Sequence, residues 1–248
     1  LRQDSVRLRG VHWGVSLDMT GENTAKTGGT FLIEKMPDPS AIWTRGDDHH
    51  TEWGGRPLDE SAMRPHYFND FLLARCLDQS RAAGSAWVVK ANPFEGGSDH
   101  TAYLNNGKPG VLFWHFTDQY YHTDGDRLDM VSPGEMQNVG TAALVSGLVL
   151  ASADGATARA IVAELQHAAF ARLEAEAALS KDTLARGGDQ AHERHILEVW
   201  GAWYVGAIRS AADIEVGGSS AATTAAIEAA VSAVERRTRE LIRSVTAE

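Results

Sequence analysis

The sequence has little cysteine, no long apolar run and a shortage of positive charge. Its single cysteine, Cys76, excludes an internal disulfide. No run reaches the roughly 18 apolar residues that a membrane-spanning helix needs, and the nearest, residues 142–153, contains Ser and Gly. The 33 acidic residues outnumber the 23 basic ones, and the formal net charge of −10 repels phosphate backbones and anionic membrane surfaces. Nucleic acid and membranes are therefore not expected as partners.

The remaining composition is that of an ordinary globular chain. At 248 residues, 43% hydrophobic and 23% charged, the chain is long enough for one large core or two smaller domains. Cys76 lies at helical spacing from Phe68 and Leu72, which favours a packed thiol over a reactive one. The amino end, residues 1–4, holds neither an initiating Met nor an apolar signal segment, so we expect an upstream part to have been removed or to lie elsewhere.

The order of the expected elements up to residue 152 is that of an α/β domain. Runs rich in β-branched and aromatic residues predict strands, and apolar residues at helical spacing predict helices. The predicted strands are residues 6–17, 30–33, 87–90 and 110–116, and the predicted helices are residues 64–83 and a helix that begins at Pro133. Ser132 is expected to cap the second helix, with Glu135 as the other half of a capping box. Gly84 suits the position that ends the first helix.

A long loop and a helical extension complete the predicted organisation. Residues 37–57 are expected to form a surface loop, and the Asp47-Asp48-His49-His50 run in it is expected to be solvated, because adjacent side chains rarely converge on one ion. Three segments rich in Ala, Leu, Glu and Arg predict helices at residues 158–179, 191–212 and 222–245. Trp200, Trp203 and Tyr204 lie at helical spacing, as core or interface residues do. We predict two domains, residues 1–153 and 154–248, with the second as a candidate dimer surface.

Three polar groups stand out as candidates for function. Each has an ordinary structural interpretation: Asp18 at a strand end as an Asx turn, residues 98–100 as a helix start, and His122 as a hydrogen-bonded surface or core residue. Ligands bind outside the carboxyl ends of strands in open α/β sheets, where Asp18 and His122 are expected. A carboxylate and an imidazole at one sheet edge are ligands that Zn²⁺ accepts. Taken together, these residues indicate a metal site.

Three sequence blocks resemble the di-zinc (co-catalytic) aminopeptidases, whose relatives include glutamate carboxypeptidase II, the transferrin receptor ectodomain and glutaminyl cyclase. The resemblance covers roughly residues 6–152. Residues 17–21 resemble the family's L-D-M-x-G strand end. Residues 97–100 with residues 107–110 resemble its S-D-H…G-x-P-x block, and residues 121–126 resemble its Y-H-T-x-x-D block.

This resemblance implies a partial three-layer α/β/α sandwich with a mixed sheet, followed by the helical extension. It also implies two zinc ions, with Asp18 as a ligand of one and His122 as a ligand of the other. The Tyr121 hydroxyl would donate to the developing oxyanion. The other residues carried over border the substrate pocket or support the ligands from behind: Ser98, Asp99, His100 and Asp126.

The rest of the family's ligand set is not found ahead of Asp18. The family needs an upstream zinc-binding His, a bridging Asp and a Glu-Glu pair, but only seventeen residues precede Asp18, with one histidine, His12, in a strand pattern. We therefore expect the carboxyl-terminal part of a zinc aminopeptidase, which hydrolyses N-terminal peptide bonds and is inactive without its missing amino-terminal half. The expected partners are that half and a peptide with a free N-terminus. Family resemblance suggests a secreted or periplasmic protein.

Two alternatives remain on the same fold. One is a non-catalytic binding or structural domain, as the relationship to the transferrin receptor illustrates. The other is glutaminyl cyclisation, which uses a single zinc ion. The upstream Glu-Glu pair, present or absent, discriminates the first alternative from the peptidase.

Overall fold

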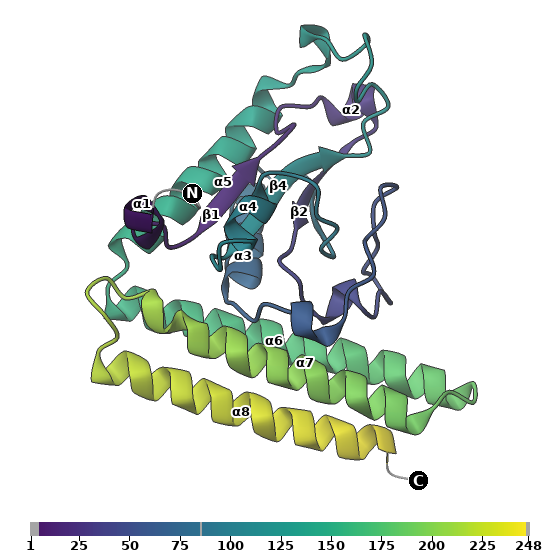
Figure 1. Ribbon diagram of the computed structural model, residues 1–248, viewed down its shortest axis with the longest axis vertical. Helices are drawn as coiled ribbons and strands as arrows, with labels where there is room; N and C mark the ends of the chain where they lie inside the picture. The colour runs from purple at the N-terminus through teal and green to yellow at the C-terminus, as the bar shows by residue number, and fades with distance from the viewer. Residues whose placement is uncertain (1–4, 85, 247–248) are drawn as a thin grey trace. The chain divides into compact units, whose positions relative to one another are not determined.

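The computed structural model describes residues 5–84 and 86–246 and divides them into two compact units (Figure 1). Unit 1 consists of the described residues up to Pro37, together with Asp48–Leu58 and Leu72–Gly147. Unit 2 consists of Asp38–Asp47, Asp59–Phe71 and the described residues from Leu148 onward. The domain boundary after residue 153 stays a prediction.

Unit 1 contains a mixed sheet whose central strand is the apolar run singled out in the sequence. The described strands are β1 (Gly14–Leu17), β2 (Thr30–Glu34), β3 (Val89–Asn92) and β4 (Gly110–Phe116), in the order β1-β4-β2-β3. Strand β4 runs parallel to β1 and antiparallel to β2, while β2 and β3 are parallel. The predicted α/β fold with a mixed sheet and a helical extension is confirmed.

Strand β4 is buried, and one of its faces carries an aromatic cluster. Every residue of β4 is buried, as its continuous apolar sequence requires. On one face Trp114 and Phe116 stack at 4.9 Å between ring centroids and pack with Leu32 and Leu112. Met19 and Tyr121 pack partly buried against this cluster. The apolar face of the sheet therefore supports the loop that carries the candidate site.

The helices of the first 152 residues vary from one turn to more than five. They are α1 (Ser5–Arg9), α2 (Thr24–Thr27), α3 (Phe68–Ala82), α4 (His100–Leu104) and α5 (Pro133–Ser152), with short 3₁₀ turns η1 (Pro39–Ala41), η2 (Glu60–Ala62) and η3 (Leu128–Met130). Helix α3 ends before Gly84, whose φ of 76° is the left-handed conformation predicted there. Cys76 on α3 is fully buried, and this burial raises the pKa of its thiol. The predicted packing role of Cys76 is confirmed.

The start of α5 has only half of the predicted capping box. The Glu135 N–H donates to Ser132 Oγ at 3.3 Å, as expected of an N-cap serine. The Ser132 N–H donates instead to the Gly21 carbonyl at 2.7 Å. The Glu135 carboxylate turns toward the sheet and lies 3.3 Å from His115 Nε2. The predicted bond between the Ser132 N–H and the Glu135 side chain is therefore wrong, because the Glu135 carboxylate faces His115 and the Ser132 N–H donates to the Gly21 carbonyl.

Three local predictions are corrected by the structure. The first predicted strand begins only at Gly14, since Ser5–Arg9 is helical, and His12 is exposed ahead of the strand. The Asp47–His50 run is not uniformly solvated. Asp48 is buried with its Oδ1 at 3.4 Å from Lys35 Nζ, and His50 Nδ1 lies 3.4 Å from Glu95 Oε1. Asp48 and His50 thus pair with residues that are distant in the sequence, and such contacts cannot be predicted from the neighbouring residues alone.

Unit 2 is built on three long helices that pack against one another (Figure 1). They are α6 (Gly155–Ala185), α7 (Gln190–Ser210) and α8 (Ala221–Thr246), with the 3₁₀ turn η4 (Ala211–Asp213) after α7. All three were predicted, and Trp200, Trp203 and Tyr204 are buried in their core. Arg45 secures its own segment to the helices through ion pairs of 2.6 Å to Glu176 and to Glu193.

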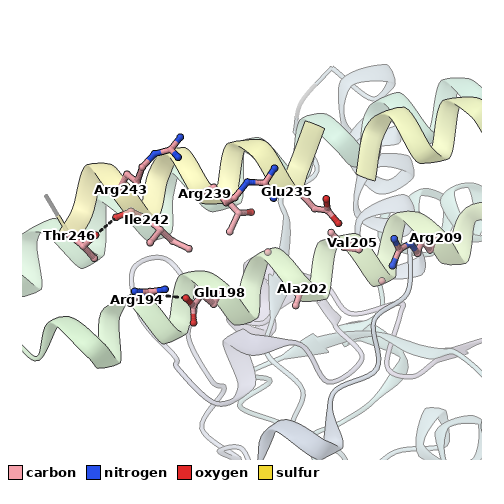
Figure 2. A pocket seen from close by; sticks show the side chains of 13 residues that line it. Arg194, Glu198, Ala202, Val205, Arg209, Glu235, Arg239, Ile242, Arg243 and Thr246 are labelled. Carbon is pink, nitrogen blue, oxygen red and sulfur yellow. Dashed lines mark hydrogen bonds and ion pairs between the residues drawn. The ribbon is translucent and has the colours of Figure 1, made fainter. Parts of the chain in front are cut away.

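A groove of about 740 Å³ lies between α7 and α8 (Figure 2). At its centre the helices approach closely, because a Cβ on Gly201 would lie 2.6 Å from Thr238 side-chain atoms. Arg194 on its α7 side pairs with Glu198 at 2.7 Å. None of the helices in the described part of the chain is long and apolar enough to cross a membrane.

Candidate active site

Asp18 follows β1 at the point where the chain leaves the sheet. Its N–H donates to the Phe113 carbonyl at 2.9 Å, which continues the β1–β4 pairing by one residue. The next residue, Met19, has a left-handed φ of 53°, an uncommon conformation for a residue with a side chain. The Asp18 carboxylate is exposed and accepts a hydrogen bond from Ser98 Oγ at 2.9 Å. Asp18 and Ser98, both predicted site residues, are thus brought together.

The turn at Met19 is held from inside the sheet by His115. His115 Nδ1 lies 2.9 Å from the Met19 carbonyl oxygen, which can only accept, so this nitrogen carries the hydrogen. The ring is fully buried, and burial lowers the pKa of His115 despite the opposing effect of Glu135. The His115 imidazole therefore fixes the backbone that presents Asp18. The sequence analysis did not identify this role.

Tyr121 and His122 lie on the loop that follows β4. The Tyr121 ring packs edge-on against Phe116, with ring centroids 5.9 Å apart. The His122 ring stacks on Tyr121 at 3.8 Å, and His122 has a left-handed φ of 55°. Burial and the negative charge of Asp18 raise the pKa of the Tyr121 phenol. Tyr121 therefore keeps its hydroxyl proton near Asp18, as a hydrogen-bond donor must.

A buried pair of carboxyl groups lies beneath this loop. Asp118 Oδ1 accepts the Tyr120 N–H at 2.7 Å, which ties this carboxylate to the loop. Glu22 is buried, and its carboxyl group interacts with the side chains of Asp118 and Thr27. Burial, followed by the charge of Asp118, raises the pKa of Glu22 from 4.5 to about 8. Glu22 therefore carries a proton at neutral pH and lies beside Asp118 without charge repulsion.

A second buried network anchors the segment that leads to Ser98. His100 is fully buried, with Nε2 at 2.9 Å from Glu34 Oε1. Glu34 Oε1 also accepts the N–H groups of Glu95 at 3.1 Å and of Gly96 at 2.8 Å. Because these bonds fix residues 95 and 96, they also restrict where the chain carries Ser98. His100 thus supports the site through Glu34 and the backbone.

The predicted site residues do not all converge. Asp18, Ser98 and Tyr121 lie together, and His122 joins them through its ring contact with Tyr121. Asp99 is exposed at the start of α4 and makes no capping hydrogen bond with its side chain. Asp126 is also exposed, and its negative charge acts on Glu22. Among the residues that the structure describes, no three His, Cys, Asp or Glu side chains are gathered to hold a metal ion.

The donor types at this site suit zinc, but their number is small. A carboxylate at Asp18 and an imidazole at His122 are ordinary zinc ligands, whereas a tetrahedral site needs four donors. Their positions follow from topology, because β1 and β4 are parallel neighbours and their carboxyl ends point the same way. The arrangement could contribute ligands and a phenolic donor to a metal site that other groups complete.

Comparison with known proteins gives a family match over part of the chain. Residues 64–146 match the family model described as Peptidase family M28. Over these residues the chain is similar to the M28 family of co-catalytic zinc aminopeptidase-like proteins, which includes relatives of glutamate carboxypeptidase II. The matched residues include Ser98, Tyr121 and His122, and Asp18 lies outside them. No curated protein and no solved structure matches the chain. The family supports a function of the metallopeptidase type that depends on zinc.

Proposed function

We propose that this chain, which is similar to the M28 family over residues 64–146, supplies about half of the active site of a zinc aminopeptidase that hydrolyses N-terminal peptide bonds. One observation carries the proposal. Asp18 and the Tyr121–His122 pair, which resemble two separate family motifs, follow the carboxyl ends of two adjoining parallel strands. The left-handed backbone at Met19 and His122 adds support, because uncommon conformations of this kind cluster at functional sites.

The residues present have distinct roles in this proposal. Asp18 and His122 would hold zinc, and the Ser98 hydroxyl orients the Asp18 carboxylate through its 2.9 Å bond. A bound pair of zinc ions supplies positive charge that polarises the scissile carbonyl and acidifies water. Tyr121 donates its phenolic hydrogen to the oxygen on which negative charge develops. The raised pKa of Tyr121 keeps that hydrogen in place throughout the neutral pH range.

The remaining ligands and the general base are proposed to come from a missing amino-terminal half of the domain. Strand β1 pairs with β4 on one side and has no second neighbour among the described strands. Leu17 at the end of β1 is 52% exposed, and Leu144 on α5 is 64% exposed. Unpaired strand edges and exposed apolar side chains favour association with a partner segment. A peptide with a free N-terminus is the proposed substrate.

A non-catalytic domain on the same fold is the second candidate function. It is favoured by the observation that the described residues contain no group of three potential metal ligands. In that case the site region would serve recognition, and the two left-handed residues would be structural. The two candidates differ in whether hydrolysis depends on His122 and Tyr121.

The test compares three variants in the assembly that contains the remaining ligands. His122→Ala removes a ligand, so zinc content and hydrolysis of an aminoacyl chromogenic substrate should fall together. Tyr121→Phe removes only a hydroxyl, so zinc should stay while kcat falls on the order of 10²–10³-fold. Tyr120→Phe is the matched control and should change neither quantity. Full kcat in Tyr121→Phe, or full zinc in His122→Ala, would contradict the assigned roles.

A further inference from the structure

The groove between α7 and α8 gathers arginines on a chain that is acidic as a whole. Charged residues of both signs line it, with arginines in the majority: Arg194, Arg209, Arg239, Arg243, Glu198 and Glu235. The whole chain has a formal net charge of −10, so the groove has the opposite sign from the molecule that carries it. A positive surface of this kind attracts an acidic partner and repels a basic one.

Three of these arginines have no carboxylate of the chain to neutralise them. Arg209, Arg239 and Arg243 are exposed and form no ion pair within the described part of the chain. By contrast Arg237, which lies on α8 outside the groove, pairs with Glu174 at 2.6 Å. An exposed, unpaired guanidinium keeps its donors available for an incoming carboxylate, which it can bind through two parallel hydrogen bonds.

The floor between these charged rims is apolar and low. Ala202 is exposed, and Val205 and Ile242 are half-buried. Deeper in the groove the two helices approach closely, because a Cβ on Gly201 would lie 2.6 Å from Thr238 side-chain atoms. The distance between packed helices depends on the side chains at the contact, and small ones allow the closest approach. The floor can therefore receive the apolar face of another helix.

The groove follows α7 and α8 over several turns (Figure 2). From Arg194 to Arg209 its α7 side is about 22 Å long, at a rise of about 1.5 Å per residue. A small anion would contact only one part of this length. A helix of about 15 residues would cover all of it, with apolar side chains on the floor and flanking acidic side chains at the arginines.

We propose that the groove between α7 and α8 binds an acidic amphipathic helix of a partner protein. The proposal goes beyond the zinc site, because none of the lining residues belongs to that site. A second copy of this chain fits the groove less well. In a twofold contact the same patch meets itself, so the unpaired arginines of the two copies would lie against one another and like charges would oppose the contact.

The binding test uses the full chain and a fluorescein-labelled helical peptide of about 16 residues, with a stripe of Leu and Ala flanked by Glu. Fluorescence anisotropy should show saturable binding that weakens as NaCl is added, because salt screens exposed charges. A peptide with the same stripe flanked by Lys, and a scrambled peptide of the Glu composition, should bind on the order of 10-fold more weakly or not at all. Absence of saturable binding, or equal binding of the Lys peptide, overturns the proposal.

Variants locate the binding to the groove. Arg239→Glu combined with Arg243→Glu should raise the Kd of the acidic peptide on the order of 10–100-fold, because attraction becomes repulsion at two points. Arg236→Glu is the matched control, since Arg236 is exposed on α8 outside the groove and should leave the Kd unchanged. Ala202→Trp should also weaken binding, because it fills the floor without changing the charge. Thermal unfolding followed by circular dichroism checks that each variant is folded. Wild-type affinity in the double arginine variant contradicts the proposal.

Sedimentation of the chain without peptide distinguishes a partner helix from a second copy. Under the proposal, Arg239→Glu combined with Arg243→Glu leaves the association state of the chain as it is in the wild type. If this variant abolishes a self-association that Leu144→Glu combined with Val145→Lys retains, the groove is occupied by a second copy and the proposal is wrong.

Discussion

At the scale of single residues, the site depends on buried ionisable groups that are not themselves candidate ligands. His115 fixes the Met19 carbonyl, Glu95 fixes Thr51, and Glu22 lies beside Asp118 under the loop of Tyr121. Burial lowers the pKa of His115 and raises the pKa of Glu22. The stability of the site region should therefore respond to pH.

Glu22 gives a prediction with a definite sign. In the folded chain its pKa is raised to about 8, whereas in the unfolded chain it is near 4.5, so unfolding releases a proton between these values. Stability from this group is complete below about pH 4.5 and falls as the pH rises toward about 8. The glutamine side chain that Glu22→Gln introduces stays neutral at every pH. The melting temperature of this variant should therefore fall less than that of the wild type as the pH rises across that range.

Thermal unfolding of the wild type, Glu22→Gln and the exposed control Glu228→Gln, followed between about pH 5 and 8, measures the effect. The control should follow the wild-type curve. Parallel curves for wild type and Glu22→Gln would show that Glu22 is ionised in the folded chain.

Some site residues could be predicted from sequence and others could not. Asp18, Tyr121 and His122 were predicted because they follow strand patterns and belong to motifs of fixed local spacing. The role of His115 was missed because it depends on contact between its Nδ1 and the Met19 carbonyl, which are 96 residues apart in the sequence. Local patterns carry no signal of a long-range anchor of this kind.

At the scale of elements, periodicity was a reliable guide for long helices and buried strands. Strand β4 has the predicted bounds, and α6, α7 and α8 were all predicted, because apolar faces of that length leave few alternatives. The first strand was predicted too long. Alternation in residues 6–12 resembles a strand, but Ser5–Arg9 forms a helix before Gly10 and the strand has only four residues. Short segments are decided by packing more than by pattern.

Alanine substitutions at two helical glycines, Gly201 and Gly140, should have opposite effects on the stability of the fold. On Gly201 a Cβ would lie 2.6 Å from the buried Thr238 side chain, so Gly201→Ala should separate α7 from α8 and destabilise the fold by about 1–3 kcal/mol. On Gly140 in α5 a Cβ would meet nothing within 4 Å, so Gly140→Ala should stabilise by about 0.5–1 kcal/mol. Denaturant unfolding measures both. Equal effects of the two substitutions would contradict the close α7–α8 approach.

At the scale of the whole molecule, the chain has features that indicate a partner. Strand β1 has one strand neighbour in the described sheet, and α5 exposes Leu144 and Val145 at 64% and 43%. Exposed apolar side chains on a helix and an unpaired strand edge are both features that favour association in water.

We predict that the isolated chain self-associates through this surface. Leu144→Glu combined with Val145→Lys should shift sedimentation toward the monomer, because the new charges are costly to bury. Leu128→Lys is the control, since Leu128 is exposed but lies in η3, outside α5. A cooperative, stable monomer of wild-type chain over a wide concentration range would argue against a missing companion.

The central claim is that Asp18 and His122 belong to one zinc site whose other ligands lie outside this chain. Zinc retained by the isolated chain after dialysis with a chelator tests it most directly, with His122→Ala and the exposed His49→Ala measured in parallel. Two ligands leave the coordination of zinc half filled, so binding should be weak, should weaken further in His122→Ala and should be unchanged in His49→Ala. Stoichiometric, chelator-resistant zinc that survives His122→Ala would contradict the claim.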